Sequence, residues 1–144
     1  MFYVAALHLP TRYIANEVRR ADGSVLHYAS TQETDALSWG TLSAIDLGHG
    51  GRIRWQVKTT EPLIGGVLAT AGGLVFSGIG QGVFAAFDSS SGQQLWAAQC
   101  EAGVNAPPIT YRIDGRQYIA VAAGGNALFG FKQGDALRVF ALPR

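Results

Sequence analysis

The sequence predicts an all-β chain built from antiparallel sheets that repeat along its length. Three observations carry this prediction. A hairpin pattern occurs twice at a spacing of about forty residues, short apolar runs are bounded by turns that contain Gly, Pro or Asp-Gly, and apolar residues nowhere keep a helical spacing for long. We therefore expect almost no helix.

The repeated hairpin consists of a strand that ends in Asp, a tight turn rich in Gly or Ser, and a second strand that ends in Trp. Asp46 and Trp55 mark the first copy, and Asp88 and Trp96 mark the second. The aspartates lie 42 positions apart and the tryptophans 41. A period of this length is typical of a β-propeller, in which each repeat is one four-stranded blade. A third copy starts at Gly134 and has no Trp, so we expect it to be a partial blade.

We expect a single partial-propeller domain over residues 1–144, with about three to three and a half four-stranded antiparallel blades. The segment 11–38 shows no clear period and carries many charged residues, so it is interpreted as an irregular loop or insertion. An incomplete ring exposes strand edges, which favour pairing with the missing blades or with a second copy of the chain. The expected parts are a strand at 1–10, the insertion at 11–38, blade repeats at 39–80 and 81–123, and the closing strand of the last blade at 124–144.

The composition argues against several classes of partner. The formal net charge is +1 and no basic cluster could follow a phosphate backbone, which excludes nucleic acid. Apolar runs are too short for a transmembrane helix of about 20 residues, and the N-terminus lacks the pattern of a secretory signal peptide. Only 15% of the residues are charged and 19 are Gly, which is typical of surfaces that face other protein.

Isolated reactive residues do not form a recognisable metal or catalytic site. His8, His27 and His49 are scattered, and Cys100 is the single cysteine, which excludes an intramolecular disulfide. Because an Asp recurs at the same point of each repeat, we expect these aspartates to stabilise turns. The glycine run at 78–82 precedes a strand, so it is interpreted as a hairpin turn and not as a phosphate-binding loop.

Four segments resemble the last blades of the PQQ-dependent (quinoprotein) methanol and ethanol dehydrogenases, which are eight-bladed propellers. The resemblance covers roughly residues 38–143, and it implies that Trp55 and Trp96 are the docking tryptophans that stack between neighbouring blades. A core role for both indoles explains the pattern equally well without any contact to a cofactor. The four segments are 65–78, 86–96, 104–111 and 114–121.

The same resemblance implies a cofactor, PQQ, lying over Ca²⁺ or a lanthanide in the complete family enzyme. The family's metal ligands, catalytic Asp and adjacent-cysteine disulfide come from earlier blades, and no segment of this chain matches them. We therefore assign no catalytic residue and no metal ligand, and we expect this chain alone to bind no cofactor. Whether it acts as an enzyme stays open at this stage.

One segment of the chain corresponds to a region near the quinone in this family. It comprises Ile64, Gly65 and Gly66, of which Ile64 stands where several relatives carry Trp. Glycine allows backbone amides to approach a ligand closely, which makes the three residues candidate cofactor contacts. The alternative is an ordinary turn that leads into the next strand.

The resemblance thus implies the C-terminal segment of a PQQ-dependent alcohol or sugar dehydrogenase, structural in role and not catalytic alone. The alternative is a noncatalytic scaffold of PQQ-like repeats that binds other proteins. A periplasmic location and a cytochrome electron acceptor are further implications for the complete enzyme. The substrate, the metal and the acceptor stay open, as does the question whether the chain is a natural protein or a truncated one.

Overall fold

The computed structural model describes residues 1–34 and 37–141. These residues form strands almost throughout, with two single turns of 3₁₀ helix, η1 (Leu47–His49) and η2 (Ala127–Phe129). The strands are β1 (Phe2–His8), β2 (Thr11–Arg19), β3 (Val25–Glu33), β4 (Trp39–Asp46), β5 (Arg52–Thr59), β6 (Val67–Ala69), β7 (Leu74–Ile79), β8 (Val83–Asp88), β9 (Gln94–Gln99), β10 (Ile109–Ile113), β11 (Arg116–Ala123) and β12 (Ala136–Ala141).

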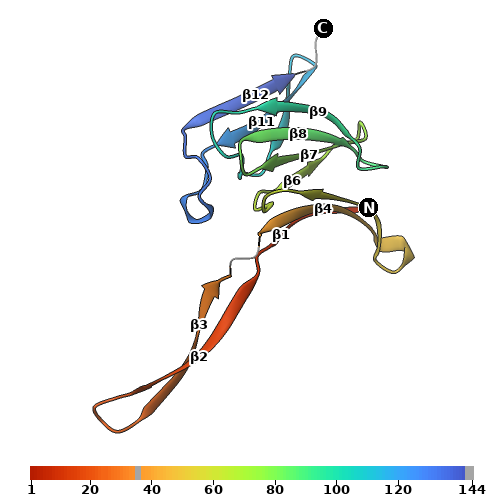
Figure 1. Cartoon of the computed structure of the whole chain (residues 1–144). Coiled ribbons are helices and arrows are strands. Elements are labelled where there is room, and N and C mark those ends of the chain that lie inside the picture. Colours follow the sequence, from red (N-terminus) through yellow and green to blue (C-terminus); the bar gives the residue numbers. More distant parts are fainter. Residues whose placement is uncertain (35–36, 142–144) are drawn as a thin grey trace.

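Three antiparallel sheets follow one another along the chain, as neighbouring blades do in a propeller (Figure 1). The first sheet has the order β1-β4-β5, the central sheet β6-β7-β8-β9 and the third sheet β10-β11-β12. The predicted all-β partial propeller with almost no helix is confirmed for the described residues. Among the residues that the structure describes, only the central sheet has the expected four strands, because the first sheet has no counterpart of β6 there and the third has none of β9.

The sequence repeat is real, but its phase differs from the expected units 39–80 and 81–123. Each of these windows joins strands of two different sheets, because the chain crosses to the next sheet directly after the strand that carries Trp. Pairing partners, and not the period, decide where a blade begins. The two hairpins are nevertheless equivalent, since both contain an irregular register two residues before the Asp, between Ala44 and Ile45 and between Ala86 and Phe87.

The expectation of an irregular loop at 11–38 is wrong for most of that segment. Strands β2 and β3 form a regular antiparallel hairpin of nine residues each, joined by a turn at Gly23, while residues 35–36 lie outside the described part. The hairpin buries neither face fully, so the apolar–polar alternation that reveals a half-buried strand is weak. Asp22-Gly23 between runs rich in aromatic and β-branched residues was the signal of a hairpin.

The ends of the chain agree in part with the expected parts. The strand expected at 1–10 is β1. The segment 124–144 opens with a loop that contains η2, and its strand β12 begins only at Ala136. Residues 142–144 lie outside the described part.

The central sheet is buried on both faces, which explains why β8 is apolar without interruption. Ala85 and Phe87 pack toward the first sheet, where they meet Leu42 and Trp55. Phe84 and Ala86 point the other way, toward a second cluster of buried side chains. That second cluster contains Phe76, Cys100, Ala102, Val104, Ile119, Val121 and Ala123.

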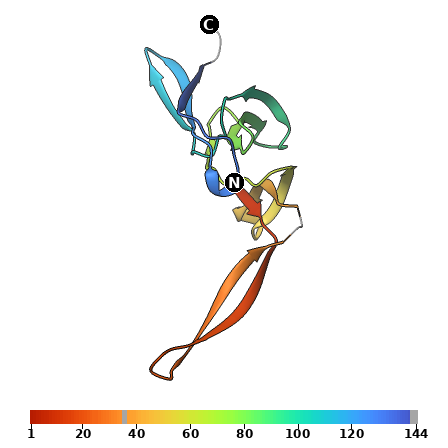
Figure 2. The ribbon, with the colours of Figure 1, turned by 60° about the vertical axis from the view of Figure 1, so that its left-hand side comes forward.

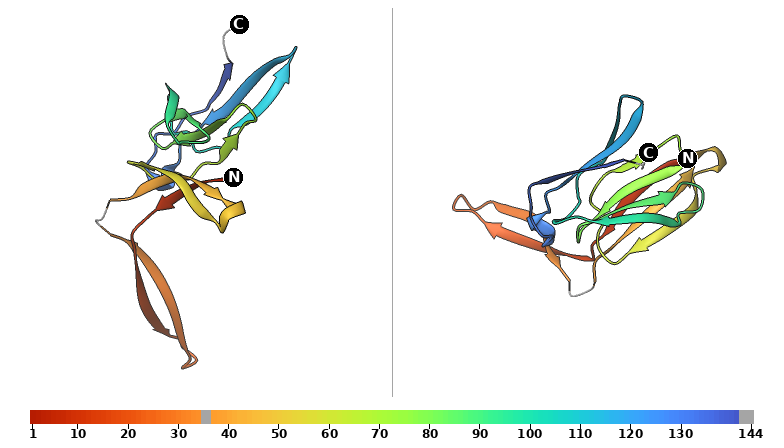
Figure 3. Two further views of the ribbon diagram at one scale, coloured as in Figure 1. Left: turned by 90° about the vertical axis from the view of Figure 1, so that its right-hand side faces the viewer. Right: turned by 90° about the horizontal axis from the view of Figure 1, so that it is seen from above.

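Successive connections alternate between the two ends of the sheets (Figure 3). We call one of these ends the loop end, because every connection of more than five residues lies there. The loop end carries the β2–β3 hairpin and the connections 60–66, 80–82, 100–108 and 124–135. The opposite end carries the tight turns 47–51, 70–73, 89–93 and 114–115.

Candidate functional site

Residues 64–66 lie at the loop end, in the connection between β5 and β6, and all three are partly buried. Their backbone approaches the connection between β9 and β10. A β-carbon on Gly66 would lie 2.5 Å from Cβ of Pro107, and one on Gly65 would lie 3.1 Å from the carbonyl oxygen of Asn105. Packing between two connections therefore requires glycine at 66 and favours it at 65, whether or not a ligand is bound.

Asn105 places an unpaired donor in the same region. Its Nδ2 is buried and has no hydrogen-bond partner. Gly103 lies next to this nitrogen, since a β-carbon on Gly103 would be only 2.9 Å from it. A buried amide without an acceptor costs about 1–3 kcal/mol, so such a group is a candidate contact for a carbonyl or carboxylate. Asn105 was missed in the sequence because nothing sets one Asn apart in a turn-forming segment.

Close backbone contacts join three connections of the loop end into one body. The amide of Gly103 donates to the carbonyl of Lys132 at 2.9 Å, and the amide of Gly125 donates to the carbonyl of Gly103 at 2.9 Å. The ring of Phe131 covers Gly80, where a β-carbon would lie 2.3 Å from the ring. The candidate residues 64–66 thus face a backbone that has little freedom to move.

The described residues hold no group of three or more His, Cys, Asp or Glu side chains that could bind a metal ion. His8 stacks on Trp39 at the loop end, whereas His49 pairs with Asp46 at the opposite end. Cys100 is buried, and desolvation raises the pKa of its thiol. In the same part of the chain no helix is long and apolar enough to cross a membrane.

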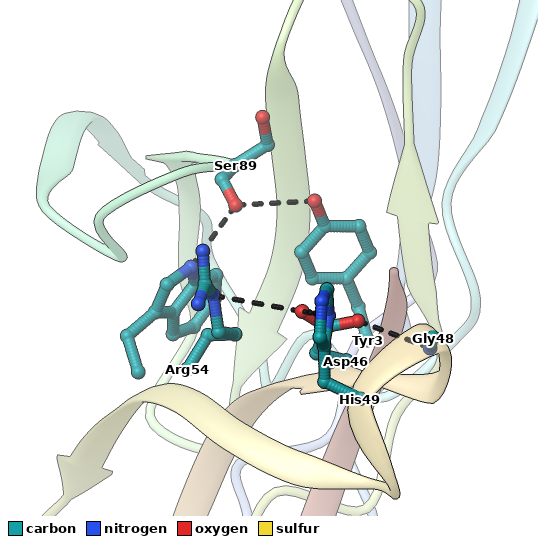
Figure 4. A network of polar contacts seen from close by, with 7 residues as sticks. Tyr3, Asp46, Gly48, His49, Arg54 and Ser89 are labelled. Carbon is teal, nitrogen blue, oxygen red and sulfur yellow. Dashed lines mark hydrogen bonds and ion pairs between the residues drawn. The ribbon is translucent and has the colours of Figure 1, made fainter.

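The aspartates of the repeat stabilise turns at the opposite end. Asp46 accepts hydrogen bonds from the amide of Gly48 at 3.0 Å and from Nδ1 of His49 at 2.9 Å (Figure 4). Asp88 accepts hydrogen bonds from both the amide and the hydroxyl of Ser90 and of Ser91, which lower the pKa of its carboxyl to about 2.

The two tryptophans of the repeat both reach from an outer strand toward the next sheet, but their partners differ. Trp55 is 9% exposed, and its Nε1 donates to the carbonyl of Ser89 at 3.0 Å. Tyr3 donates to the same carbonyl at 3.1 Å (Figure 4). Trp96 is 39% exposed and meets Phe140 of β12 edge to face, with 5.0 Å between the ring centres.

The sequence of the chain is similar to those of known proteins. Residues 20–119 match the PQQ family described as the glucose/ethanol/alcohol dehydrogenase β-propeller domain. A quinoprotein ethanol dehydrogenase of Pseudomonas aeruginosa is 41% identical over 147 residues, covering 98% of this chain and 23% of that protein. A quinoprotein glucose dehydrogenase A of Acinetobacter calcoaceticus is 44% identical over 88 residues, covering 60% of this chain and 11% of that protein.

Solved structures show the same relationship. The quinohemoprotein alcohol dehydrogenase of Comamonas testosteroni matches with a TM-score of 0.74 and 27% identity, over 96% of this chain and 23% of that one. A europium-containing methanol dehydrogenase matches with a TM-score of 0.69 and 30% identity, over 85% of this chain and 22% of that one. The chain spans less than a quarter of the length of these proteins. By sequence and by fold it belongs to the β-propeller family of PQQ-dependent glucose, ethanol and alcohol dehydrogenases.

Proposed function

We propose that the chain is the C-terminal segment of a PQQ-dependent alcohol or sugar dehydrogenase, in which it forms part of the wall of the quinone-binding propeller. The observation that carries the proposal is at the loop end, where Gly65 lies against the backbone of Asn105, a residue whose side-chain amide is buried and unpaired. In this proposal the role is structural and supportive. Among the described residues there is no group of three or more His, Cys, Asp or Glu side chains that could bind a metal ion, and the pair of His49 and Asp46 lies at the opposite end from residues 64–66.

The residues of the loop end fit a quinone with carboxylate groups, but the described residues do not fit its metal ion. Nδ2 of Asn105 would donate to a carbonyl or carboxylate oxygen of the quinone, and Ile64 would give an apolar contact beside it. When bound, PQQ supplies the acceptor for the hydride of the alcohol. Metal ligands and the general base belong, in this proposal, to blades outside the chain, and the chain alone binds no cofactor.

Two features of the relatives extend the proposal to the complete enzyme. The names of a lupanine 17-hydroxylase and of a quinohemoprotein alcohol dehydrogenase include a cytochrome or haem, which supports a cytochrome as electron acceptor. We place the complete enzyme in the periplasm, as in bacterial dehydrogenases of this type. The outer edges of β1 and β12 pair with no strand of the described chain, so they are available to the missing blades or to a second copy.

The proposal is tested by replacing the matched part of the Pseudomonas aeruginosa enzyme with this chain. The chimera should bind PQQ and oxidise alcohols with an artificial electron acceptor, whereas the isolated chain with PQQ and Ca²⁺ should do neither. Alcohol oxidation by the isolated chain would contradict the structural role. A chimera that folds but does not bind PQQ would contradict the proposed family function.

Substitutions at the loop end test the contacts of the cofactor. Ile64→Ala and Asn105→Ala in the chimera should each weaken PQQ binding, measured by equilibrium dialysis, with a smaller effect on thermal stability. Leu47→Ala is the matched control, because Leu47 is 66% exposed and lies at the opposite end. Equal PQQ affinity of all three variants would remove residues 64–66 and Asn105 from the proposed site.

A noncatalytic scaffold is the second candidate function. It is favoured by the close packing of Gly65 and Gly66 against residues 105–107, which explains both glycines without any cofactor. A scaffold should bind a partner protein equally well with and without PQQ. Affinity capture in the two conditions, followed by measurement of the affinity for the captured protein, separates the two functions.

A further inference from the structure

Strands β2 and β3 form an arm, residues 11–33, that stands away from the three sheets (Figure 2). Strands β1 and β4 of the first sheet correspond to β7 and β8 of the central sheet. A turn of residues 80–82 connects β7 to β8, whereas the arm lies between β1 and β4. Strands of nine residues extend about 30 Å. The arm leaves the first sheet at the loop end and extends to the side that faces away from the central and third sheets (Figure 1, Figure 3).

Side-chain contacts in the first sheet lie next to the base of the arm. His8, the last residue of β1, stacks on Trp39, the first residue of β4, with 3.6 Å between ring centres and 3° between ring planes. Lys58 of β5 lies over the same indole, its Nζ 4.4 Å from the ring centre. Nε2 of His8 also lies 3.2 Å from the hydroxyl of Thr41. These contacts hold the ends of β1 and β4 together where the arm leaves the first sheet.

The two faces of the arm both mix apolar and polar side chains, but one of them carries more of the large apolar ones. Residues paired across the hairpin share a face, and Val18 lies directly opposite Leu26. The other face carries Glu17 opposite His27, and also Tyr13 and Val25. We call the first face the apolar face and define it by Ile14, Val18, Leu26 and Tyr28, which are 38%, 46%, 43% and 47% exposed. Polar residues lie between and beside them on the same face, namely Arg12, Asn16, Ser30 and Gln32.

An isolated two-stranded hairpin is only marginally stable in water, so this apolar face is expected to pack on something. Four half-exposed side chains offer roughly a few hundred Å², well below the ~800 Å² that each partner buries in a stable complex of separate proteins. That area is too small for a second copy of the chain. It is sufficient within one polypeptide, where the effective concentration is high.

We propose that the apolar face of the arm packs on the loop end of the blade that precedes this chain in the complete dehydrogenase. The proposal rests on the proposed function, because it needs the remaining blades. It follows from the direction of the arm, away from the central and third sheets, and from the length of the relatives, since the matched region is only 23% of the Pseudomonas aeruginosa protein. The arm then holds two neighbouring blades together across the face that carries residues 64–66.

Adjacent residues of β3 provide a matched pair for the test. Leu26 is on the apolar face and Val25 on the other, and their exposures, 43% and 37%, are similar. In the chimera with the Pseudomonas aeruginosa enzyme, Leu26→Asp should lower the thermal midpoint and Val25→Asp should not. Backbone amides of β2 and β3 should exchange at least tenfold more slowly in the unsubstituted chimera than in the isolated chain, and Leu26→Asp should abolish this protection.

The outcomes distinguish the arm contact from the function. Equal midpoints for the two variants, or equal amide exchange in chimera and isolated chain, would overturn the arm contact. So would a dimer of the isolated chain that Leu26→Asp converts to a monomer, because the occupant would then be a second copy. A chimera whose arm is protected but which does not bind PQQ supports the arm contact and refutes the proposed function. A chimera that binds PQQ but whose arm is not protected refutes the arm contact and supports the proposed function.

Discussion

The indole of Trp55 lies so close to Gly92 that a β-carbon on this glycine would be 2.6 Å from Cε3 of the ring. The contact joins the outer strand of the first sheet to the β8–β9 turn of the central sheet. Gly92 also has a φ of +75°, which L side chains rarely adopt. Two independent physical requirements therefore select glycine at this position.

Gly92→Ala should lower the free energy of unfolding by about 3 kcal/mol, from backbone strain together with overpacking against a rigid ring. Gly50→Ala is the control for strain alone, because Gly50 has a φ of +73° and nothing within 4 Å of its β-carbon position. That variant should lose only about 1 kcal/mol. Urea unfolding of the two variants makes the comparison, and equal losses would mean that the Trp55 contact contributes nothing.

Trp55→Ala should destabilise the isolated chain by about 3–5 kcal/mol, because it empties a buried site and leaves the carbonyl of Ser89 with one donor fewer. Trp96→Ala should cost clearly less, since that indole is 39% exposed. The check is the midpoint of chemical unfolding, with Trp55→Phe as an intermediate case that keeps an aromatic ring. A larger loss at Trp96 would contradict the packing described for the two sheets.

The turn at Asp88 should weaken in acid. Hydrogen bonds from Ser90 and Ser91 lower the pKa of Asp88 to about 2 from the ordinary 3.8. A carboxyl whose pKa is depressed on folding stabilises the fold above the unfolded pKa, so this contribution is complete above about pH 4 and is lost as the pH falls toward 2. Asp88→Asn should remove that part of the pH dependence, as measured by stability between pH 5 and pH 2.

The cause of the low pKa can be tested separately. In the double variant S90A/S91A the two hydroxyl donors are gone while both backbone amides stay, so the pKa of Asp88 should rise toward its ordinary value. Titration of the carboxyl carbon by NMR gives that pKa directly. An unchanged titration curve would show that the serine hydroxyls do not hold this carboxylate.

Gly78→Ala should disrupt the loop end, because its β-carbon would lie 2.1 Å from the carbonyl oxygen of Val104, a backbone atom that cannot rotate away. We expect a loss of at least about 3 kcal/mol, or failure to fold. Gly72→Ala is the matched control, since its nearest neighbour would be 3.9 Å away. Thermal unfolding of both variants checks the prediction, and two similar midpoints would refute it.

Features that depend on neighbouring residues in the sequence were predictable. Asp46 and Asp88 stabilise turns through groups two or three residues away, and the repeat of strand, turn and strand is visible in the residue types themselves. The phase of the blades was not predictable from the period, because it depends on which strands pair. The arm was missed because strands without a buried face lack the alternation that reveals them.

The candidate site also combines residues that the sequence indicates with contacts that only the structure shows. Residues 64–66 came from a resemblance, and only the structure shows that Gly65 and Gly66 face residues 105–107, some forty positions further along. No local pattern encodes such a contact. The same is true of Gly80 under Phe131 and of the unpaired amide of Asn105, which depend on how three connections meet at one end of the sheets.

The contact of Trp55 with the central sheet also has a consequence for biosynthesis. The carbonyl that receives its indole N–H belongs to a residue 34 positions later in the chain. At a synthesis rate of about 5–20 residues per second, the ribosome needs roughly 2–7 seconds to supply that residue. During this interval the nascent chain displays an uncovered aromatic surface, which is the kind of surface that chaperones bind.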